Sequence, residues 1–200
     1  MRERFRGQIA GTGSTSGIRV VVGDWRDTPL GAFSDAMVER ADGHRLLLAP
    51  HPEAADFIAA TYTFDKVRLE PISVVTTETG WRVRSPSLDL DLTLGRRTAL
   101  GGLLRLVPRR LAESPTWSAL TDPIARVLLR GVRTRGSAGG GRREYYGATD
   151  AHRVTAMRGS LDGVDLGAIA PVDPPCRFGF SSTPRRPTVT TVVTTVESVD

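Results

Sequence analysis

Residues 88–94, with the sequence LDLDLTL, decide the fold class because they alternate strictly between apolar and polar side chains. Successive side chains of a β-strand point to opposite faces, so the four leucines share one face. Asp89, Asp91 and Thr93 share the other face. We predict a half-buried antiparallel strand whose polar face contacts either solvent or an internal pocket.

Other segments on both sides of this strand have the same β character, with alternation or runs of β-branched residues. They are residues 18–22, 32–39, 44–49, 67–75, 81–84, 152–160, 176–180 and 188–196. Asp42-Gly43 separates two of these runs, and Asp-Gly in that position is a strong hairpin signal. The chain is therefore predicted to form a mainly antiparallel sheet.

Two regions have helical character instead. Residues 52–60, PEAADFIAA, begin with proline and carry acids in the first turn, as helix N-termini prefer. Residues 99–130 are rich in leucine and contain Ser114-Pro115 and Asp122-Pro123, two good helix starts. We therefore predict one α+β domain over residues 1–200, with a helical insertion near 99–130. The sheet is expected to curl into a partial barrel or cone, since many short strands need their edges protected.

The composition limits the cell compartment and the partners. Cys176 is the single cysteine, so no disulfide can form within the chain. The N-terminal segment lacks a signal-peptide core, and no apolar run reaches the length of a membrane helix. We expect a soluble cytoplasmic protein without a membrane partner. The net charge is +5, but the arginines are scattered among acids, so nucleic-acid binding is only an alternative.

The richest polar stretch is residues 133–153, RTRGSAGGGRREYYGATDAHR. Its three glycines allow close backbone approach to a ligand. Arg142 and Arg143 can hold a carboxylate or phosphate through paired N–H groups. On a strand Arg143 shares a face with Tyr145, and Glu144 shares the other face with Tyr146. We predict Arg142, Arg143, Glu144 and Tyr146 as ligand-binding residues.

The same stretch contains candidate catalytic residues. Asp150 and His152 are two residues apart, so both lie on one face of a regular strand. A carboxylate beside a histidine fixes its tautomer and raises its pKa, which suits general acid–base catalysis. We predict His152, Asp150 and Tyr145 as catalytic groups, with Arg143 and His152 facing one cavity. The alternative is a solvated loop followed by a structural strand.

Two other kinds of site are excluded by spacing. The segments TGSTSGI at 12–18 and YTFDK at 62–66 match the loop and catalytic pair of short-chain dehydrogenases, but the glycine loop opens a strand rather than a helix. His44, His51 and His152 have no metal-ligand spacing. We therefore expect neither a cofactor nor a bound metal.

The segment GRREYYG at 141–147 resembles the GRExxG motif of the acetoacetate decarboxylase family, and GAFSDAMV at 31–38 is similar to one of its strands. The resemblance implies a mostly antiparallel, barrel-like fold around an internal pocket. In that family a lysine follows the motif and forms a Schiff base with a keto acid. Here ATDAH follows at 148–152, so that chemistry has no amine.

These observations lead to three hypotheses. The first is binding, with lyase- or isomerase-type proton transfer, of a small carboxylate-bearing molecule in a β-lined pocket. The second is a non-enzymatic basic module that binds nucleic acid or an acidic partner through residues 130–143. The third is a structural or interaction protein, for example a homodimer paired through residues 188–196 at a sheet edge.

Overall fold

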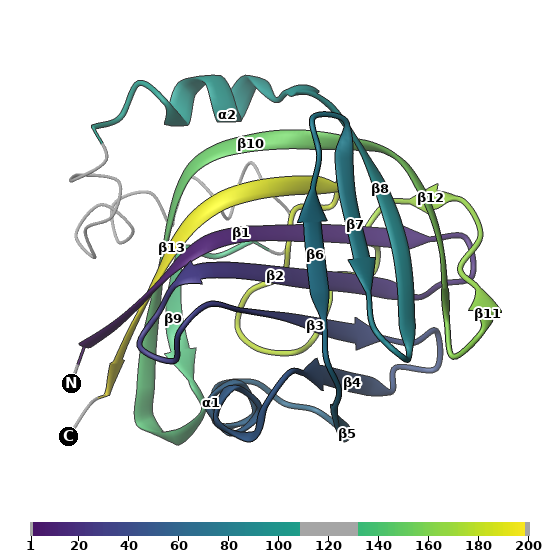
Figure 1. Cartoon of the computed structure of the whole chain (residues 1–200). Helices are drawn as coiled ribbons and strands as arrows, with labels where there is room; N and C mark the ends of the chain where they lie inside the picture. Colours follow the sequence, from purple (N-terminus) through teal and green to yellow (C-terminus); the bar gives the residue numbers. More distant parts are fainter. Residues whose placement is uncertain (1, 109–131, 199–200) are drawn as a thin grey trace.

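A computed structural model describes residues 2–108 and 132–198, which form one strongly curled sheet with two α-helices (Figure 1). The strands are β1 (Arg2–Ser14), β2 (Arg19–Asp27), β3 (Phe33–Glu39), β4 (Arg45–Ala49), β5 (Lys66–Leu69), β6 (Ser73–Thr76), β7 (Gly80–Arg84), β8 (Leu88–Arg97), β9 (Arg135–Ala138), β10 (Arg142–Leu161), β11 (Val164–Asp165), β12 (Ile169–Ala170) and β13 (Thr188–Ser198). The helices are α1 (Pro52–Thr61) and α2 (Ala99–Leu104), with a 3-10 turn at Gly139–Gly141.

The sheet order is β5-β4-β3-β2-β1-β13-β10-β8-β7-β6, and β9, β11 and β12 pair off this path. Among the described pairings only β4 with β5 is parallel. The predicted curled, mainly antiparallel sheet is confirmed. The strand β13 lies between β1 and β10, so it offers no free edge for pairing with another chain.

The curl brings the two ends of the sheet over each other. In Figure 1, β6, β7 and β8 cross in front of β1, β2 and β3. Leu88, Leu90 and Leu92 are buried in the core between these layers. Asp89 and Asp91 lie on the solvent side and pair with Arg84. The predicted alternation of β8 is confirmed, and its polar face contacts solvent rather than a pocket.

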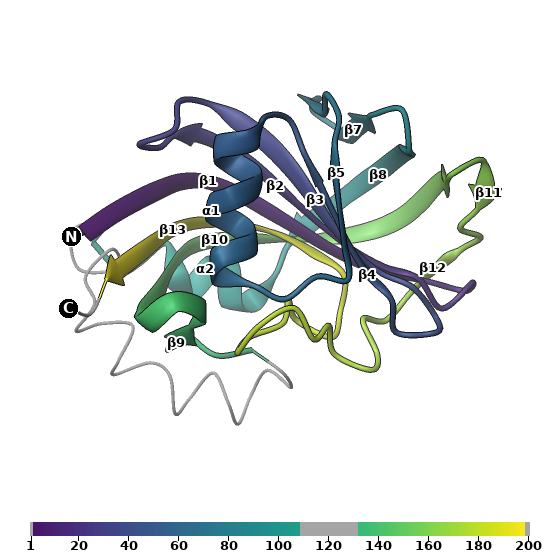
Figure 2. The same ribbon diagram turned by 90° about the horizontal axis from the view of Figure 1, so that it is seen from below.

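The other face of the central strands, here called the α1 face, is covered by α1 and by the chain between β12 and β13 (Figures 1 and 2). Buried aromatic residues fill this layer, including Phe5 of β1 and Phe178 of the covering chain. The helix begins as predicted, with Pro52 in its first turn, and His51 caps it by accepting from the backbone N–H of Ala54.

Two predicted strands are wrong. Residues 67–75 were expected to form one strand, but they divide into β5 and β6, which lie at opposite ends of the sheet. The break falls at Glu70-Pro71, because proline restricts the residue before it and cannot donate a ladder hydrogen bond. Residues 176–180 form no strand and cover the α1 face instead. Of the predicted insertion at 99–130, α2 is present, and residues 109–131 lie outside the described part of the chain.

Candidate functional site

The first residues of β10 divide between its two faces, as strand alternation predicts. Glu144 pairs with Val196 and Tyr146 pairs with Thr194, so both project from the α1 face. Arg142 shares that face, where it contacts α1. Arg143 is exposed and Tyr145 is half-buried on the opposite face. The structure therefore brings three of the four predicted ligand-binding residues to one side of the strand.

On the α1 face Glu144 and Tyr146 meet Tyr62, the residue that follows α1. The Tyr62 hydroxyl donates to Glu144 Oε1 at 3.1 Å, and the Tyr146 hydroxyl donates to Glu144 Oε2 at 3.2 Å. The two hydroxyl oxygens are 2.6 Å apart. Glu144 is 1% exposed, so the carboxyl group relies on the two tyrosines rather than on water. We call these residues the Tyr62–Glu144–Tyr146 ring.

The protonation of Glu144 decides which hydrogen bonds the ring can make. When Glu144 is ionised, the two tyrosine hydroxyls supply two protons for the three O···O contacts of 2.6, 3.1 and 3.2 Å. When Glu144 is protonated, all three contacts can be hydrogen bonds, with Glu144 donating to one tyrosine, that tyrosine to the other, and the second tyrosine back to Glu144. Burial raises the pKa of Glu144 to about 7, against the lowering effect of the tyrosine hydrogen bonds and of Arg142. Burial likewise raises the pKa of both Tyr62 and Tyr146 well above 10. Glu144 is thus a carboxyl group that gains and loses its proton near neutral pH.

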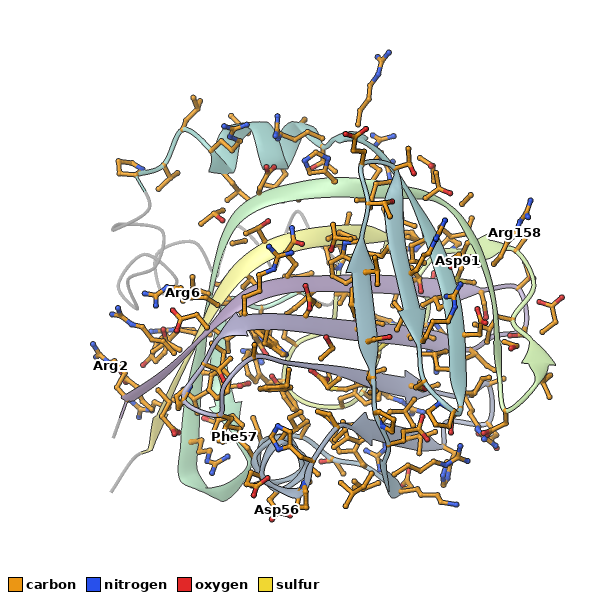
Figure 3. The ribbon with its side chains drawn as sticks, viewed as in Figure 1. Arg2, Arg6, Asp56, Phe57, Asp91 and Arg158 are labelled. Atoms are coloured by element: carbon orange, nitrogen blue, oxygen red, sulfur yellow. The ribbon has the colours of Figure 1, made fainter. Side chains whose placement is uncertain are left out.

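Arg142 connects this ring to the end of α1. Its Nη1 donates to the backbone carbonyl of Phe57 at 3.1 Å and to Thr61 Oγ1 at 2.9 Å. Its guanidinium carbon lies 4.7 Å from the centre of the aromatic side chain of Phe57. Phe57 is labelled beside α1 in Figure 3. A cation at the C-terminus of a helix is favourable because the last carbonyls carry partial negative charge. Arg142 therefore fixes β10 to α1 and places positive charge beside the ring.

A pocket of about 500 Å³ opens beside Tyr62. It lies between the end of α1, the chain around Ser137 and Gly139, and the segment that contains Phe178. Its lining combines apolar surface with hydroxyl groups, from Ala59, Ala60, Thr61, Tyr62, Thr63, Phe64, Val67, Ser137, Gly139, Phe178 and Gly179. Tyr62 belongs to both the lining and the ring, so one side chain connects the pocket wall with Glu144.

The predicted catalytic pair lies elsewhere on β10. The pairing of β10 with β13 shifts by one residue between Ala148 and Asp150, a β-bulge that changes which residues share a face. After it, Asp150 and His152 project from the face that also carries Arg143. His152 lies nine positions after Arg143, or about 30 Å along an extended strand. Neither residue lines the pocket beside Tyr62.

Asp150 and His152 form a local group with the end of β8. Arg97 Nε donates to Asp150 Oδ1 at 2.8 Å, and His152 Nε2 is 3.6 Å from Asp150 Oδ2. His152 Nδ1 is 3.4 Å from the carbonyl oxygen of Gly95. The pKa of Asp150 is lowered, because the hydrogen bond from Arg97 and other favourable contacts outweigh burial. The structure thus holds Asp150 ionised beside Arg97, with Tyr145 in a different part of the strand.

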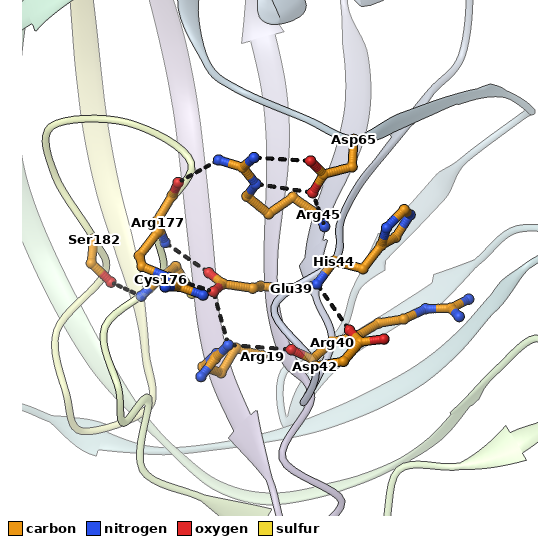
Figure 4. Close-up of polar contacts among 10 residues, drawn as sticks. All are labelled: Arg19, Glu39, Arg40, Asp42, His44, Arg45, Asp65, Cys176, Arg177 and Ser182. Atoms are coloured by element: carbon orange, nitrogen blue, oxygen red, sulfur yellow. Dashed lines mark hydrogen bonds and ion pairs between the residues drawn. The ribbon is translucent and has the colours of Figure 1, made fainter.

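Two buried carboxyl groups on the α1 face escaped the sequence analysis. Asp35 of β3 accepts from Trp25 Nε1 at 2.8 Å, and burial raises its pKa to about 7. Glu39 is fully buried and contacts the cations of Arg19 and Arg177 (Figure 4). The contact with Arg177, which also donates its backbone N–H to Glu39 at 2.7 Å, fastens the covering chain to β3.

Within the described residues no group of His, Cys, Asp and Glu is arranged to hold a metal ion. In the same part of the chain, neither helix is long and apolar enough to cross a membrane. Cys176 is buried, and burial raises the pKa of its thiol to about 12, which makes it a poor nucleophile.

These features describe a curled-sheet α+β protein with a titratable carboxyl group beside a pocket. No protein-family model matches the chain, and no curated protein matches its sequence. Among solved structures it is similar to an acetoacetate decarboxylase from Legionella pneumophila, with 8% identity over 98% of this chain and 82% of that one, at a TM-score of 0.43. A second acetoacetate decarboxylase structure matches with 10% identity over 99% and 86%, at a TM-score of 0.39. The predicted weak resemblance in fold to that family is confirmed.

Proposed function

We propose that this protein binds a small carboxylate-bearing organic molecule in the pocket beside Tyr62 and exchanges protons with it. The observation that carries this proposal is the position of Tyr62, a residue of the pocket lining whose buried hydroxyl donates to Glu144. A ligand carboxylate or carbonyl oxygen there would receive hydrogen bonds from the threonine and serine hydroxyls of the lining, and also from Tyr62 once its hydroxyl turns from Glu144 to the ligand. Arg142 donates to Thr61 Oγ1 and so places a positive charge behind the pocket lining. That charge favours an anionic ligand.

The proton transfer in this proposal runs through the ring. With a pKa of about 7, Glu144 can give a proton at neutral pH and take it back, which is what general acid–base catalysis requires. Tyr62 would relay that proton by accepting one at its oxygen from Glu144 as it gives its own to the ligand, because it contacts Glu144 and belongs to the pocket lining. The predicted catalytic roles of His152, Asp150 and Tyr145 are not part of this mechanism, and their test is given with the experiment below.

The binding step can be measured by saturation-transfer NMR with acetate, pyruvate and benzoate as probes. We expect at least one probe to bind, and Tyr62→Phe to weaken it about 10-fold or more, because a hydrogen bond to a charged group contributes about 1.5–3 kcal/mol. Tyr145→Phe is the matched control, since Tyr145 lies on the opposite face of β10. Absence of binding by all three probes, or equal effects of the two tyrosine variants, would refute the proposed site.

The chemical step can be followed by the exchange of pyruvate methyl protons in D₂O. We expect the protein to accelerate this exchange and Glu144→Gln to abolish the acceleration, since the amide cannot transfer a proton. His152→Ala tests the competing assignment: loss of exchange in that variant alone would move the chemistry to the Asp150–His152 group.

The alternative of a basic binding module stays a prediction that a binding assay can test. Several described arginines outside residues 130–143 pair with carboxylates, for instance Arg45 with Asp65 and Arg185 with Asp173. Paired arginines present less free charge to a phosphate backbone. Elution from heparin at low salt is the expected result.

A further inference from the structure

The short helix α2 packs against the protein through its smallest residue. Gly101 lies against the backbone of β10, where an added Cβ would come within 2.4 Å of the Ala151 carbonyl oxygen. The helix is also anchored at its start, because Thr98 caps it by accepting from the Gly101 N–H and donates its own backbone N–H to Ala151 O. The glycine side of α2 is therefore its inner side.

The outer side of α2 is rich in leucine. Leu103 and Leu106 follow Gly101 by two and five positions, which places them away from it on a helical turn and its continuation. They are 64% and 80% exposed, and Leu100 is 37% exposed. Figure 1 shows α2 along the rim of the molecule above β10. A surface helix normally buries its apolar residues, so this inverted arrangement indicates a binding surface.

The local sequence around these leucines is basic. Residues 95–108, GRRTALGGLLRLVP, contain three arginines and no acid. Arg96 and Arg105 are exposed, and Arg97 pairs with Asp150. We call Leu100, Leu103, Leu106, Arg96 and Arg105 the α2 surface.

We propose that the α2 surface docks the protein onto an anionic lipid surface. Leucines that insert into the headgroup region, with arginines beside them, are the features that hold amphipathic segments in a membrane interface. A second copy of the chain fits less well, because a two-fold dimer through this surface would bring like arginines together. The proposal departs from the sequence-based expectation of a soluble protein without a membrane partner, which rested on the missing signal-peptide core and the short apolar runs.

The experiment is co-sedimentation of the whole protein with vesicles of phosphatidylcholine alone or with 30% phosphatidylglycerol. We expect binding to the anionic vesicles that weakens as salt rises. The double variant Leu103→Ser/Leu106→Ser should lower the partition coefficient about 10-fold or more, and Arg105→Gln about fivefold. Val164→Ser is the matched control, because Val164 on β11 is as exposed as Leu103.

Each outcome decides the proposal. Loss of binding in the leucine variant but not in the Val164 variant would support it. Failure of the unmodified protein to sediment with anionic vesicles would overturn it, as would equal binding by all variants. Circular dichroism and sizing accompany the assay: a leucine variant that melts earlier, or changes oligomeric state, without any lipid binding would assign these leucines to protein contacts instead.

Discussion

The raised pKa of Glu144 predicts a specific dependence of stability on pH. In the unfolded chain this carboxyl group titrates near 4.5, and in the fold at about 7. Because the folded-state value is the higher one, the contribution is fully present below about pH 4.5 and is lost as pH rises through about 7. The difference corresponds to about 3 kcal/mol, at about 1.4 kcal/mol for each pH unit.

Glu144→Gln isolates this contribution. The amide keeps one donor and one acceptor for the two tyrosine hydroxyls but does not ionise. We expect the variant to be about as stable as the original protein at pH 4.5 and about 3 kcal/mol more stable at pH 8. Urea unfolding at a series of pH values, followed by circular dichroism, measures the free energy of unfolding for both proteins.

The quantity to compare is the difference in the free energy of unfolding between Glu144→Gln and the original protein at each pH. Other titrating groups affect both proteins equally and so cancel in this difference. Asp35 also has its pKa raised to about 7 by burial, so the original protein should lose stability from both carboxyl groups. Asp35→Asn should remove its own part of that loss and leave the Glu144 part in place. Parallel curves for the original protein and Glu144→Gln would show that Glu144 ionises freely in the fold and that burial does not raise its pKa.

Two further predictions concern stability. Glu39→Gln should lower the free energy of unfolding by about 3–5 kcal/mol, because it leaves the buried cation of Arg19 without its carboxylate, whereas Glu197→Gln at a surface pair should cost at most about 1 kcal/mol. Equal effects in thermal melts would contradict the burial of the Glu39 cluster. Gly101→Ala should destabilise by about 1–3 kcal/mol, since the added methyl group meets the β10 backbone, while Gly102→Ala, with open space, should stabilise by up to about 1 kcal/mol. A stabilising Gly101→Ala, seen by urea unfolding, would mean that α2 is not packed through this glycine.

Local sequence patterns predicted the elements that local forces determine. The alternation in residues 88–94 correctly predicted β8. The pattern is informative because the leucines are buried on one side of the strand and the aspartates face water on the other. Asp42-Gly43 gave the β3–β4 hairpin, in which Glu39 pairs with Arg45. The start of α1 followed from Pro52 and its first-turn acid.

Residues far apart in the sequence could not be joined in this way. Residues 67–75 have continuous β character and were predicted as one strand. Only the sheet order shows that β5 and β6 lie at the two opposite ends of the sheet. Tyr62 meets Glu144 across 82 positions, and no local signal connects them. Tyr62 entered the sequence analysis only through its spacing to Lys66, a match that the fold then excluded.

The β-bulge after Ala148 explains why the predicted site divides into two. Counted by simple alternation, Glu144, Tyr146, Asp150 and His152 have the same parity and would project from one face of β10. The one-residue shift moves Asp150 and His152 to the opposite face, so the polar residues of this single strand divide into two separate groups. Only the group with Tyr62 reaches the pocket. A bulge of this kind is set by how β10 bends between β13 and β8, and sequence alternation alone carries no record of it.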